Sequence, residues 1–256
     1  MNKKDRPAPK PRVAFFDFAC CEGCQLQIAN LEEDVIGLTN VVEVVEFREV
    51  LTGKAPSYDI AFIEGSITRK EDEERLRDIR SRAKLLVAYG QCAVSGGINR
   101  LKNHWHSMEK VKKEVYGDHF HMPHLNTYPT RGVDEVVKVD LYIPGCPINR
   151  DEFLRMVKEL VLGKMPRLPN YPVCVECKLK ENACLFDFSI VCLGPLARAG
   201  CGAICPSNGS PCEACRGTVD NPNKNAMVEI LQKYNYTVDE IKKKINIFGV
   251  HPEVAA

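Results

Sequence analysis

Three features are missing from this sequence, and each absence excludes a class of protein. No run of about eighteen apolar residues occurs, so the sequence predicts no membrane-spanning helix. Neither charge dominates, because 35 Lys and Arg residues stand against 34 Asp and Glu. A general binder of nucleic acid or acidic membranes needs a basic surplus, which is absent here. No apolar stretch follows the charged start at residues 1–7, so we expect no signal peptide and a cytoplasmic location.

Signatures of bond-making catalysis and of nucleotide binding are also missing. No Ser–His–acid set stands out in the chain. The glycine pair Gly96-Gly97 lacks the GxGxxG spacing that a dinucleotide site needs. We therefore expect this chain to carry no catalytic residue of its own.

Cysteine, in contrast, is unusually abundant, with 13 copies in 256 residues. Disulfides are disfavoured in a reducing cytosol, and the odd count leaves one thiol unpaired. A chain of this length can also bury a hydrophobic core without covalent cross-links. Metal ligation is the better interpretation. Structural disulfides and scattered buried thiols are the alternatives.

The cysteines divide the chain into two regions. Five precede residue 150, and the other eight lie between Cys174 and Cys215. Between the regions, residues 163–172 contain three prolines, which end a helix and predict an extended linker. We expect two domains, residues 1–166 and residues 167–256.

The first region alternates between strand and helix patterns. Short, mostly apolar runs predict strands at residues 13–18, 41–50, 59–63, 85–88 and 139–143. Helical periodicity predicts helices at residues 25–36, 69–82 and 150–162. Strands alternating with helices imply right-handed crossovers and a parallel sheet. The expected fold class is α/β, with a flavodoxin-like doubly wound parallel sheet.

Four cysteines of the first region follow the ends of predicted strands: Cys21, Cys24, Cys92 and Cys146. Because the carboxyl ends of parallel strands gather at one edge of the sheet, we expect these thiols to converge. Small residues let the backbone approach a bulky cofactor, and each loop contains one: Gly23, Gly90 and Gly145. Four thiolates suit zinc or an iron–sulfur cluster. The scattered spacing favours iron–sulfur, since structural zinc usually uses two compact CxxC pairs.

The second region holds enough thiols for two further clusters: Cys174, Cys177, Cys184, Cys192, Cys201, Cys205, Cys212 and Cys215. The Cys205-Pro206 pair is similar to bacterial ferredoxins, although the cysteine spacings differ. We expect a small, loop-rich, ferredoxin-like iron–sulfur domain, with two zinc sites as the alternative. Twelve ligands leave one cysteine over. Cys20, beside the first CxxC, is our candidate for a packed thiol.

Near the end of the chain, residues 236–246 predict a surface helix with a capping box at residues 237–240.

Several motifs together resemble the small subunit of [NiFe] hydrogenases. They are CEGCQLQ at residues 21–27, GQCAVSGG at residues 90–97 and PGCP at residues 144–147. CLGP at residues 192–195, RAGCG at residues 198–202 and PCEACRG at residues 211–217 are most similar to the delta-type subunits of the cytosolic branch. That branch includes the sulfhydrogenase delta subunit and the small subunits of F420-non-reducing hydrogenases. The resemblance covers about residues 12–218.

This resemblance implies three [4Fe-4S] clusters and their ligands. Cys21, Cys24, Cys92 and Cys146 would hold the proximal cluster. Cys201, Cys205, Cys212 and Cys215 would hold the medial cluster, and Cys174, Cys177, Cys184 and Cys192 the distal one. Periplasmic relatives have histidine at the position of Cys174 and proline at that of Cys205. Thiolate ligation at both positions implies a medial [4Fe-4S] cluster and low potentials, within the span of about −700 to +450 mV for such clusters.

The function implied is electron transfer in a soluble [NiFe] hydrogenase complex. Electrons would pass between the nickel–iron site of a large subunit and a flavin-, NAD(P)- or ferredoxin-linked partner, which includes iron–sulfur or flavin electron-transfer subunits. The alternative is the same relay in a hydrogenase-derived oxidoreductase whose large subunit lacks nickel–iron. A third, non-redox alternative is a zinc-stabilised scaffold. We expect no nucleic-acid or membrane partner.

Overall fold

A computed structural model describes residues 9–105, 107–118 and 122–248 of the chain. Residues 1–7, on which the expectation of no signal peptide rests, lie outside this described part. Among the described residues, no helix combines the length and the apolar character that crossing a membrane requires.

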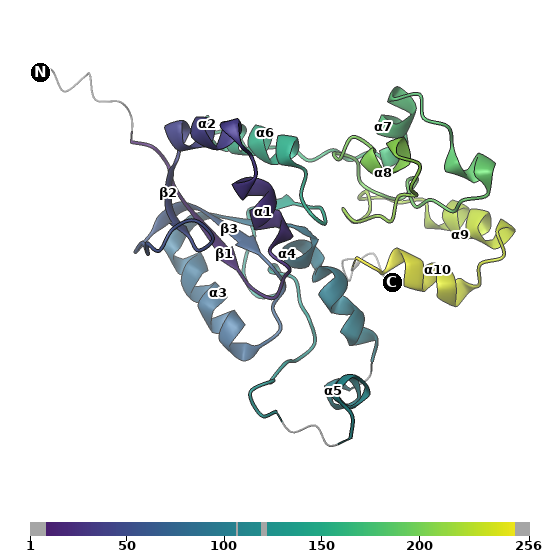
Figure 1. Cartoon of the computed structure of the whole chain (residues 1–256), viewed down its shortest axis with the longest axis horizontal. Helices are drawn as coiled ribbons and strands as arrows, with labels where there is room; N and C mark the ends of the chain where they lie inside the picture. Colours follow the sequence, from purple (N-terminus) through teal and green to yellow (C-terminus); the bar gives the residue numbers. More distant parts are fainter. Residues whose placement is uncertain (1–8, 106, 119–121, 249–256) are drawn as a thin grey trace, which may run out of the picture.

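Five parallel strands form the central sheet (Figure 1). They are β1 (Arg12–Asp17), β2 (Glu43–Phe47), β3 (Tyr58–Glu64), β4 (Ala83–Tyr89) and β5 (Leu141–Ile143). Their order is β2-β1-β3-β4-β5, which is the flavodoxin-like order of a doubly wound sheet. The α/β fold and the five predicted strands are therefore confirmed. In such a sheet the chain reverses its winding beside β1 and β3, whose ends form the crevice where cofactors bind.

Helices cover both faces of the sheet. α1 (Gly23–Ala29), α2 (Glu33–Val41) and α6 (Arg150–Val161) lie over one face, and α3 (Lys70–Arg82) lies over the other (Figure 1). The single helix expected at residues 25–36 is wrong. Glu32 has a φ of 54° and a ψ of −121°, which no α-helix accommodates, so the chain forms α1 and α2 instead.

Successive strand residues supply two separate cores. Phe15 and Phe62 pack on the face covered by α6, whereas Phe16 and Ile63 pack on the α3 face. This alternation follows from the two-residue repeat of a strand. Both faces are apolar, as expected for a parallel sheet between helices.

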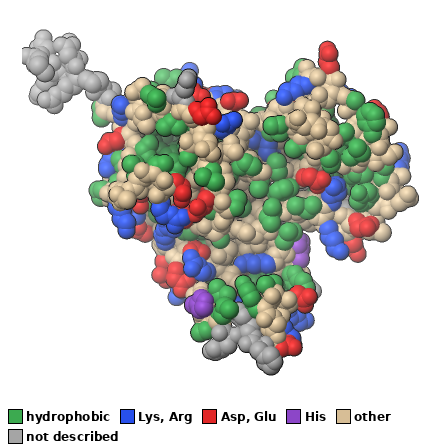
Figure 2. Space-filling view, in the orientation of Figure 1, with side chains coloured by type: hydrophobic (Ala, Val, Ile, Leu, Met, Phe, Trp, Pro, Cys, Tyr) green, Lys and Arg blue, Asp and Glu red, His purple; other side chains and the backbone are tan. Residues whose placement is uncertain are grey.

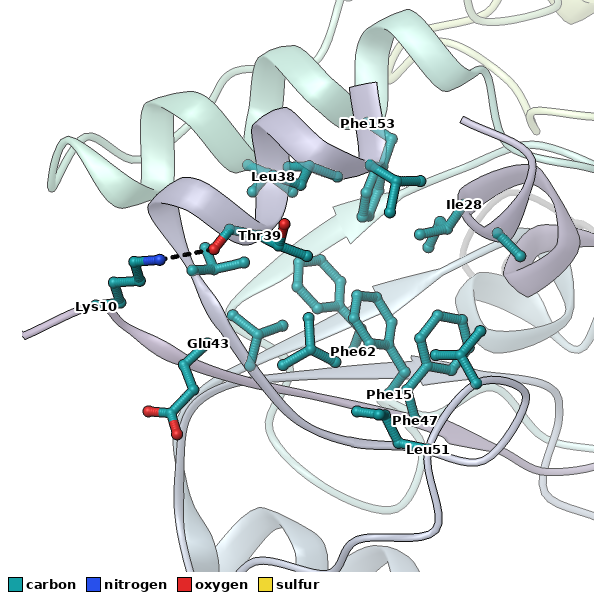
Figure 3. Close-up of a pocket in the computed structure, with 17 residues that line it drawn as sticks. Lys10, Phe15, Ile28, Leu38, Thr39, Glu43, Phe47, Leu51, Phe62 and Phe153 are labelled. Carbon is teal, nitrogen blue, oxygen red and sulfur yellow. Dashed lines mark hydrogen bonds between the residues drawn. The ribbon is translucent and has the colours of Figure 1, made fainter. Parts of the chain in front are cut away.

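The first of these cores encloses a cavity of about 400 Å³ below α2 (Figure 3). Phe15, Phe47, Phe62 and Phe153 are among its lining residues, and no cysteine lines it. Lys10 donates a hydrogen bond to the carbonyl oxygen of Thr39 at 2.8 Å on one side of the cavity. This cavity is therefore separate from the cysteine loops.

A long connection between β4 and β5 carries α4 (Gln91–Ser95), the 3-10 helix η2 (Gly97–His104) and α5 (Met108–Tyr116). α5 projects below the sheet in Figure 1 and buries none of its residues. The sequence pattern did not predict these helices.

The chain after α6 consists of helices and loops. It contains α7 (Val173–Leu179), the 3-10 helix η3 (Leu185–Phe188), α8 (Ile204–Ser207), α9 (Lys224–Lys233) and α10 (Val238–Ile245). Val173, Leu193 and Leu231 belong to a third core beneath them. The predicted capping box is confirmed, because Thr237 N–H bonds Glu240 Oε2 at 2.9 Å and Glu240 N–H bonds Thr237 Oγ1 at 3.3 Å.

We expect Phe62→Ala to destabilise the sheet core by about 3–5 kcal/mol, since large-to-small changes leave a cavity. Phe62 is fully buried and its ring lies 5.0 Å from that of Phe15 and 5.4 Å from that of Phe153. Urea unfolding of the anaerobically isolated protein measures the change. Val115→Ala, on an exposed side chain, serves as the control and should shift stability by less than about 0.5 kcal/mol. Equal midpoints for the two variants would contradict this packing.

Candidate metal centres

All thirteen cysteines are free of disulfides, so the disulfide interpretation is not supported. Among the described residues, no three His, Cys, Asp or Glu side chains lie close enough together to hold one metal ion. A cluster of iron and sulfide is bulkier than one ion and holds its thiolates farther apart. The fit of a cluster is therefore tested by the cavities and contacts among the cysteines.

The first CxxC loop leaves the end of β1 and enters α1. A buried carboxylate holds this entry, because Glu64 at the end of β3 accepts the backbone N–H groups of Cys24 at 3.1 Å and of Gln25 at 3.0 Å. Burial raises the pKa of Glu64, and these two hydrogen bonds oppose the rise. Glu22, within the loop, has a φ of 61°, a conformation that costs about 1–3 kcal/mol. The hydrogen bonds of Glu64 and the backbone conformation of Glu22 thus fix the shape of the loop that carries Cys21 and Cys24.

Cys92 and Cys146 come to the same place from the ends of β4 and β5. Burial, followed by the charges of Cys146 and Cys21, raises the pKa of Cys92 to about 12. Burial, followed by the charges of Cys215 and Cys21, raises the pKa of Cys146 to about 11. Burial and the charges of Glu64, Cys92 and Cys146 also raise the pKa of Cys24. The four strand-end thiols predicted to converge are therefore close enough to influence one another. We call Cys21, Cys24, Cys92 and Cys146 the first group.

The three predicted glycines have different surroundings. At Gly90, with a φ of 80°, a Cβ would lie 2.5 Å from the sulfur of Cys24, so no larger residue fits there. At Gly23, a Cβ would lie 3.3 Å from the sulfur of Cys21. At Gly145, a Cβ would instead meet the backbone oxygen of Pro147 at 2.7 Å. Gly23 and Gly90 thus leave room for sulfur, and Gly145 leaves room for its own turn.

A second group of cysteines lines one cavity of about 880 Å³: Cys201, Cys205, Cys212 and Cys215. Cys146 of the first group and Arg216 line the same cavity. Ala203 and Ala214 lie in the two loops that carry these thiols, with φ values of 49° and 56°. Positive φ is uncommon outside glycine, and such strain gathers at ligand sites.

A third group lines a smaller cavity of about 90 Å³: Cys174, Cys177, Cys184 and Cys192. Its remaining lining includes the apolar side chains of Val173, Leu185 and Phe186. Asn182 Nδ2 donates to the sulfur of Cys177 at 3.7 Å. Burial, followed by the charges of Cys192 and Cys177, raises the pKa of Cys174 to about 11.

Backbone hydrogen bonds connect the three groups in a fixed order. The amide of Cys146 in the first group bonds the sulfur of Cys215 in the second, which opposes the rise in the pKa of Cys215 that burial causes. The amide of Cys212 in the second group donates to the sulfur of Cys192 in the third at 3.2 Å. The second group therefore lies between the other two.

Cys20, the expected spare thiol, lies beside the first group. Burial, followed by the charge of Glu64, raises the pKa of Cys20 to about 12, and a backbone hydrogen bond with Glu22 opposes this.

The raised thiol pKa values indicate that these sites need positive charge before their thiols can ionise. A thiol with a pKa of 11 to 12 keeps its proton at neutral pH, so Cys92 and Cys174 are neutral in the metal-free chain. A bound metal must displace these protons, and its positive charge then compensates the buried thiolates. Soft thiolates in sets of four fit iron–sulfur clusters.

Sequence reasoning missed three residues that support these sites. Glu64 is the first of them, and the signal that could have identified it is a carboxylate at the end of an apolar strand. Arg216 and Glu152 form a buried ion pair at 2.8 Å between the cysteine loops and α6. Nothing in the local sequence marks that pair, because its members are 64 residues apart.

A flavodoxin-like sheet with cysteine loops at its strand ends, followed by two more groups of four cysteines, defines an iron–sulfur oxidoreductase subunit. Comparison with known proteins agrees. Residues 21–160 match the model of the family described as NADH ubiquinone oxidoreductase, 20 Kd subunit. The chain belongs to this family, within its branch of hydrogenase small subunits.

Individual relatives are similar over most of the chain. Sulfhydrogenase 2 subunit delta of Pyrococcus furiosus is 33% identical, covering 93% of this chain and 99% of the relative. A subunit of the F420-non-reducing hydrogenase vhu of Methanococcus voltae is 33% identical, covering 83% of this chain and 84% of the relative. A subunit in the crystal structure of an NAD+-reducing [NiFe]-hydrogenase in the H2-reduced state has 30% identity and a TM-score of 0.57, covering 62% of this chain and 96% of that one. These relatives are hydrogenase subunits, so the predicted resemblance is confirmed.

We expect Gly90→Ala to lose the metal of the first group, because its methyl group would collide with the sulfur of Cys24. Metal analysis of the anaerobically isolated protein should show less bound metal than in the unmodified protein. Gly117→Ala is the matched control, since Gly117 has a φ of 83° but nothing within 4 Å of its added carbon. A metal content in Gly90→Ala equal to that of Gly117→Ala and of the unmodified protein would contradict the steric argument.

Proposed function

We propose that this chain is the electron-transfer small subunit of a soluble [NiFe] hydrogenase complex, and that it carries three [4Fe-4S] clusters in a row. The observation that carries this proposal is the order of the cysteine groups. Each neighbouring pair of groups is joined by one backbone N–H bond to a cysteine sulfur. A linear order of redox sites is what a relay between two partners needs.

We assign the three groups to the ligand sets that the family resemblance implies. The first group would hold the proximal cluster, nearest the large subunit. The second group, Cys201, Cys205, Cys212 and Cys215, would hold the medial cluster. The third group, Cys174, Cys177, Cys184 and Cys192, would hold the distal cluster. The shared cavity linings of the second and third groups support these assignments.

When bound, iron–sulfur clusters supply sites that accept and release single electrons. The residues of this chain bind them, exclude water and adjust their potentials. Amides that donate to sulfur, such as those of Cys146 and Cys212, stabilise the more negative, reduced form. Buried carboxylates such as Glu64 oppose reduction, so the balance of these groups around each site sets its potential.

The two ends of the row offer surfaces for different partners. At the first group, Cys21 is exposed, and the neighbouring Leu26 is 48% exposed. We assign this end to the large subunit. At the third group, Leu179 is 80% exposed and Phe188 is 62% exposed, and Figure 2 has hydrophobic side chains on this outer side of the molecule. We assign that end to a flavin/NAD(P)- or ferredoxin-linked partner.

We also propose that the chain divides into two domains, residues 1–166 and residues 167–256. Two cores lie within the first part, and a third core lies after the linker. The first part would hold the proximal cluster, and the second part the medial and distal clusters. A cytoplasmic location belongs to this proposal as well.

A second candidate is the same relay in an oxidoreductase whose large subunit lacks nickel–iron. The description of the matched family, an NADH ubiquinone oxidoreductase subunit, favours keeping this candidate. Both candidates use this chain in the same way and differ in the chemistry of the partner.

Iron and acid-labile sulfide analysis tests the clusters. We expect about twelve irons and as many sulfides per chain, falling to about eight in Cys21→Ser because one cluster loses a ligand. Cys20→Ser is the matched control on the adjacent residue and should keep all of them. Stoichiometric zinc in place of iron would support the scaffold interpretation. A loss of iron in Cys20→Ser would contradict our ligand set for the first group.

Hydrogen-dependent dye reduction tests the hydrogenase assignment. The complex purified anaerobically with its large subunit should reduce a low-potential dye under hydrogen. Cys184→Ser should slow transfer to the physiological acceptor, because it removes a ligand at the exit end of the row. A complex that retains its iron but never reacts with hydrogen would favour the second candidate.

A further inference from the structure

We propose that the buried pair of Arg216 and Glu152 couples the first and second cluster sites. Arg216 would hold their loops together and raise the reduction potential of the second cluster. This inference rests on the proposed function, because it requires clusters at both sites. Neither the family match nor the predicted ligand sets assigns a role to these two residues.

Arg216 is buried and all of its donor nitrogens have partners. Its side chain is 3% exposed, and that of Glu152 is 5% exposed. Nη2 bonds Glu152 Oε1 at 2.9 Å, Nη1 bonds the carbonyl oxygen of Pro144 at 2.8 Å, and Nε bonds that of Ala199 at 3.0 Å. A guanidinium keeps its charge even in such surroundings. It is therefore a permanent buried cation with a fixed orientation.

These contacts connect the two cluster sites and α6. Pro144 begins the loop that carries Cys146 of the first group, and Arg216 directly follows Cys215 of the second. The amide of Cys146 bonds the sulfur of Cys215 in the same place. Arg216 thus braces the point where the two groups come closest along the row.

The fold leaves space for this pair at one specific position. Gly200 has a φ of 113°, and a Cβ there would lie 2.5 Å from Arg216 Nη2 and 2.6 Å from Glu152 Oε1. Only glycine permits both the backbone conformation and the close approach. Gly200 immediately precedes Cys201, so the pair also fixes the other loop of the second group.

The two charges of the pair lie at different distances from the second site. Arg216 lines the cavity of the second group, and Glu152 is absent from that lining. The cation is therefore nearer the site than the carboxylate. A nearby buried cation stabilises the more negative, reduced form of a thiolate-bound cluster, because charges interact strongly where water is excluded. Arg216 should raise the potential, and Glu152 should partly offset it.

Charge-specific variants test this directly by redox titration followed by electron paramagnetic resonance. The signal altered by Cys205→Ser identifies the second cluster in the anaerobically isolated holoprotein. Arg216→Gln should lower its midpoint potential by about tenfold in the reduction equilibrium, or about 59 mV for one electron. Glu152→Gln should raise the potential by a smaller amount, because the carboxylate lies farther from the site. The double variant should lie between Arg216→Gln and the unmodified protein, since the smaller effect of Glu152 is removed together with the larger effect of Arg216.

A merely structural role would not give shifts of opposite sign. Arg80→Gln is the matched control: Arg80 also pairs with a carboxylate, that of Asp140, and bonds a carbonyl, but it lies in the last turn of α3, beside the start of β4 and away from the carboxyl ends of the strands. It should leave the potential unchanged. If Arg216→Gln does not fold, the potential measured for Glu152→Gln alone still tests the inference. This variant keeps an amide oxygen that can accept the hydrogen bond from Arg216.

Shifts in the same direction for both single variants, or no shift in Glu152→Gln, would overturn the inference. Absence of iron–sulfur signals in the unmodified protein would instead overturn the proposed function.

Discussion

Negative charge on buried sulfur is the constraint on which this structure depends. Each of the three groups contains buried or half-buried thiols, and burial raises the pKa of Cys92 to about 12 and that of Cys174 to about 11. Sets of four ionised thiolates are stable in such places only when positive charge compensates them. In the proposed function, inorganic iron would supply that charge, while backbone amides and one buried guanidinium would supply the remainder. Loop strain at Glu22, Ala203 and Ala214 is accepted where these thiols have to be placed.

The flavodoxin-like sheet meets this constraint by geometry. Its parallel strands bring Cys24, Cys92 and Cys146 to one edge, although they are far apart in the sequence. The same edge presents Glu64, which fixes the entry to α1. From there the amide-to-sulfur bonds continue through Cys215 and Cys192 into the smaller helical part. Each site is thereby built partly from the residues of the next.

Much of this could be predicted from the sequence, and the failures have physical reasons. Apolar strand runs predicted all five strands, since a sheet covered on both faces needs them. The break at Glu32 was missed because helical periodicity continues across it. α5, which buries none of its residues, was missed although Met108, Val111 and Val115 repeat at helical spacing. The positions of four cysteines after predicted strands indicated that these thiols converge, and the family resemblance implied the other two sets. Neither indicated the pair of Arg216 and Glu152, whose contact depends on tertiary packing.

Anomalous X-ray scattering from anaerobically grown crystals tests the central claim most directly. Data collected at the iron and zinc absorption edges locate each metal independently of any spectroscopic assignment. Our account predicts three separate iron peaks, one within each group of four cysteines, with the middle peak beside Arg216. Zinc peaks at these positions, or an iron peak missing from any of the three groups, would contradict it.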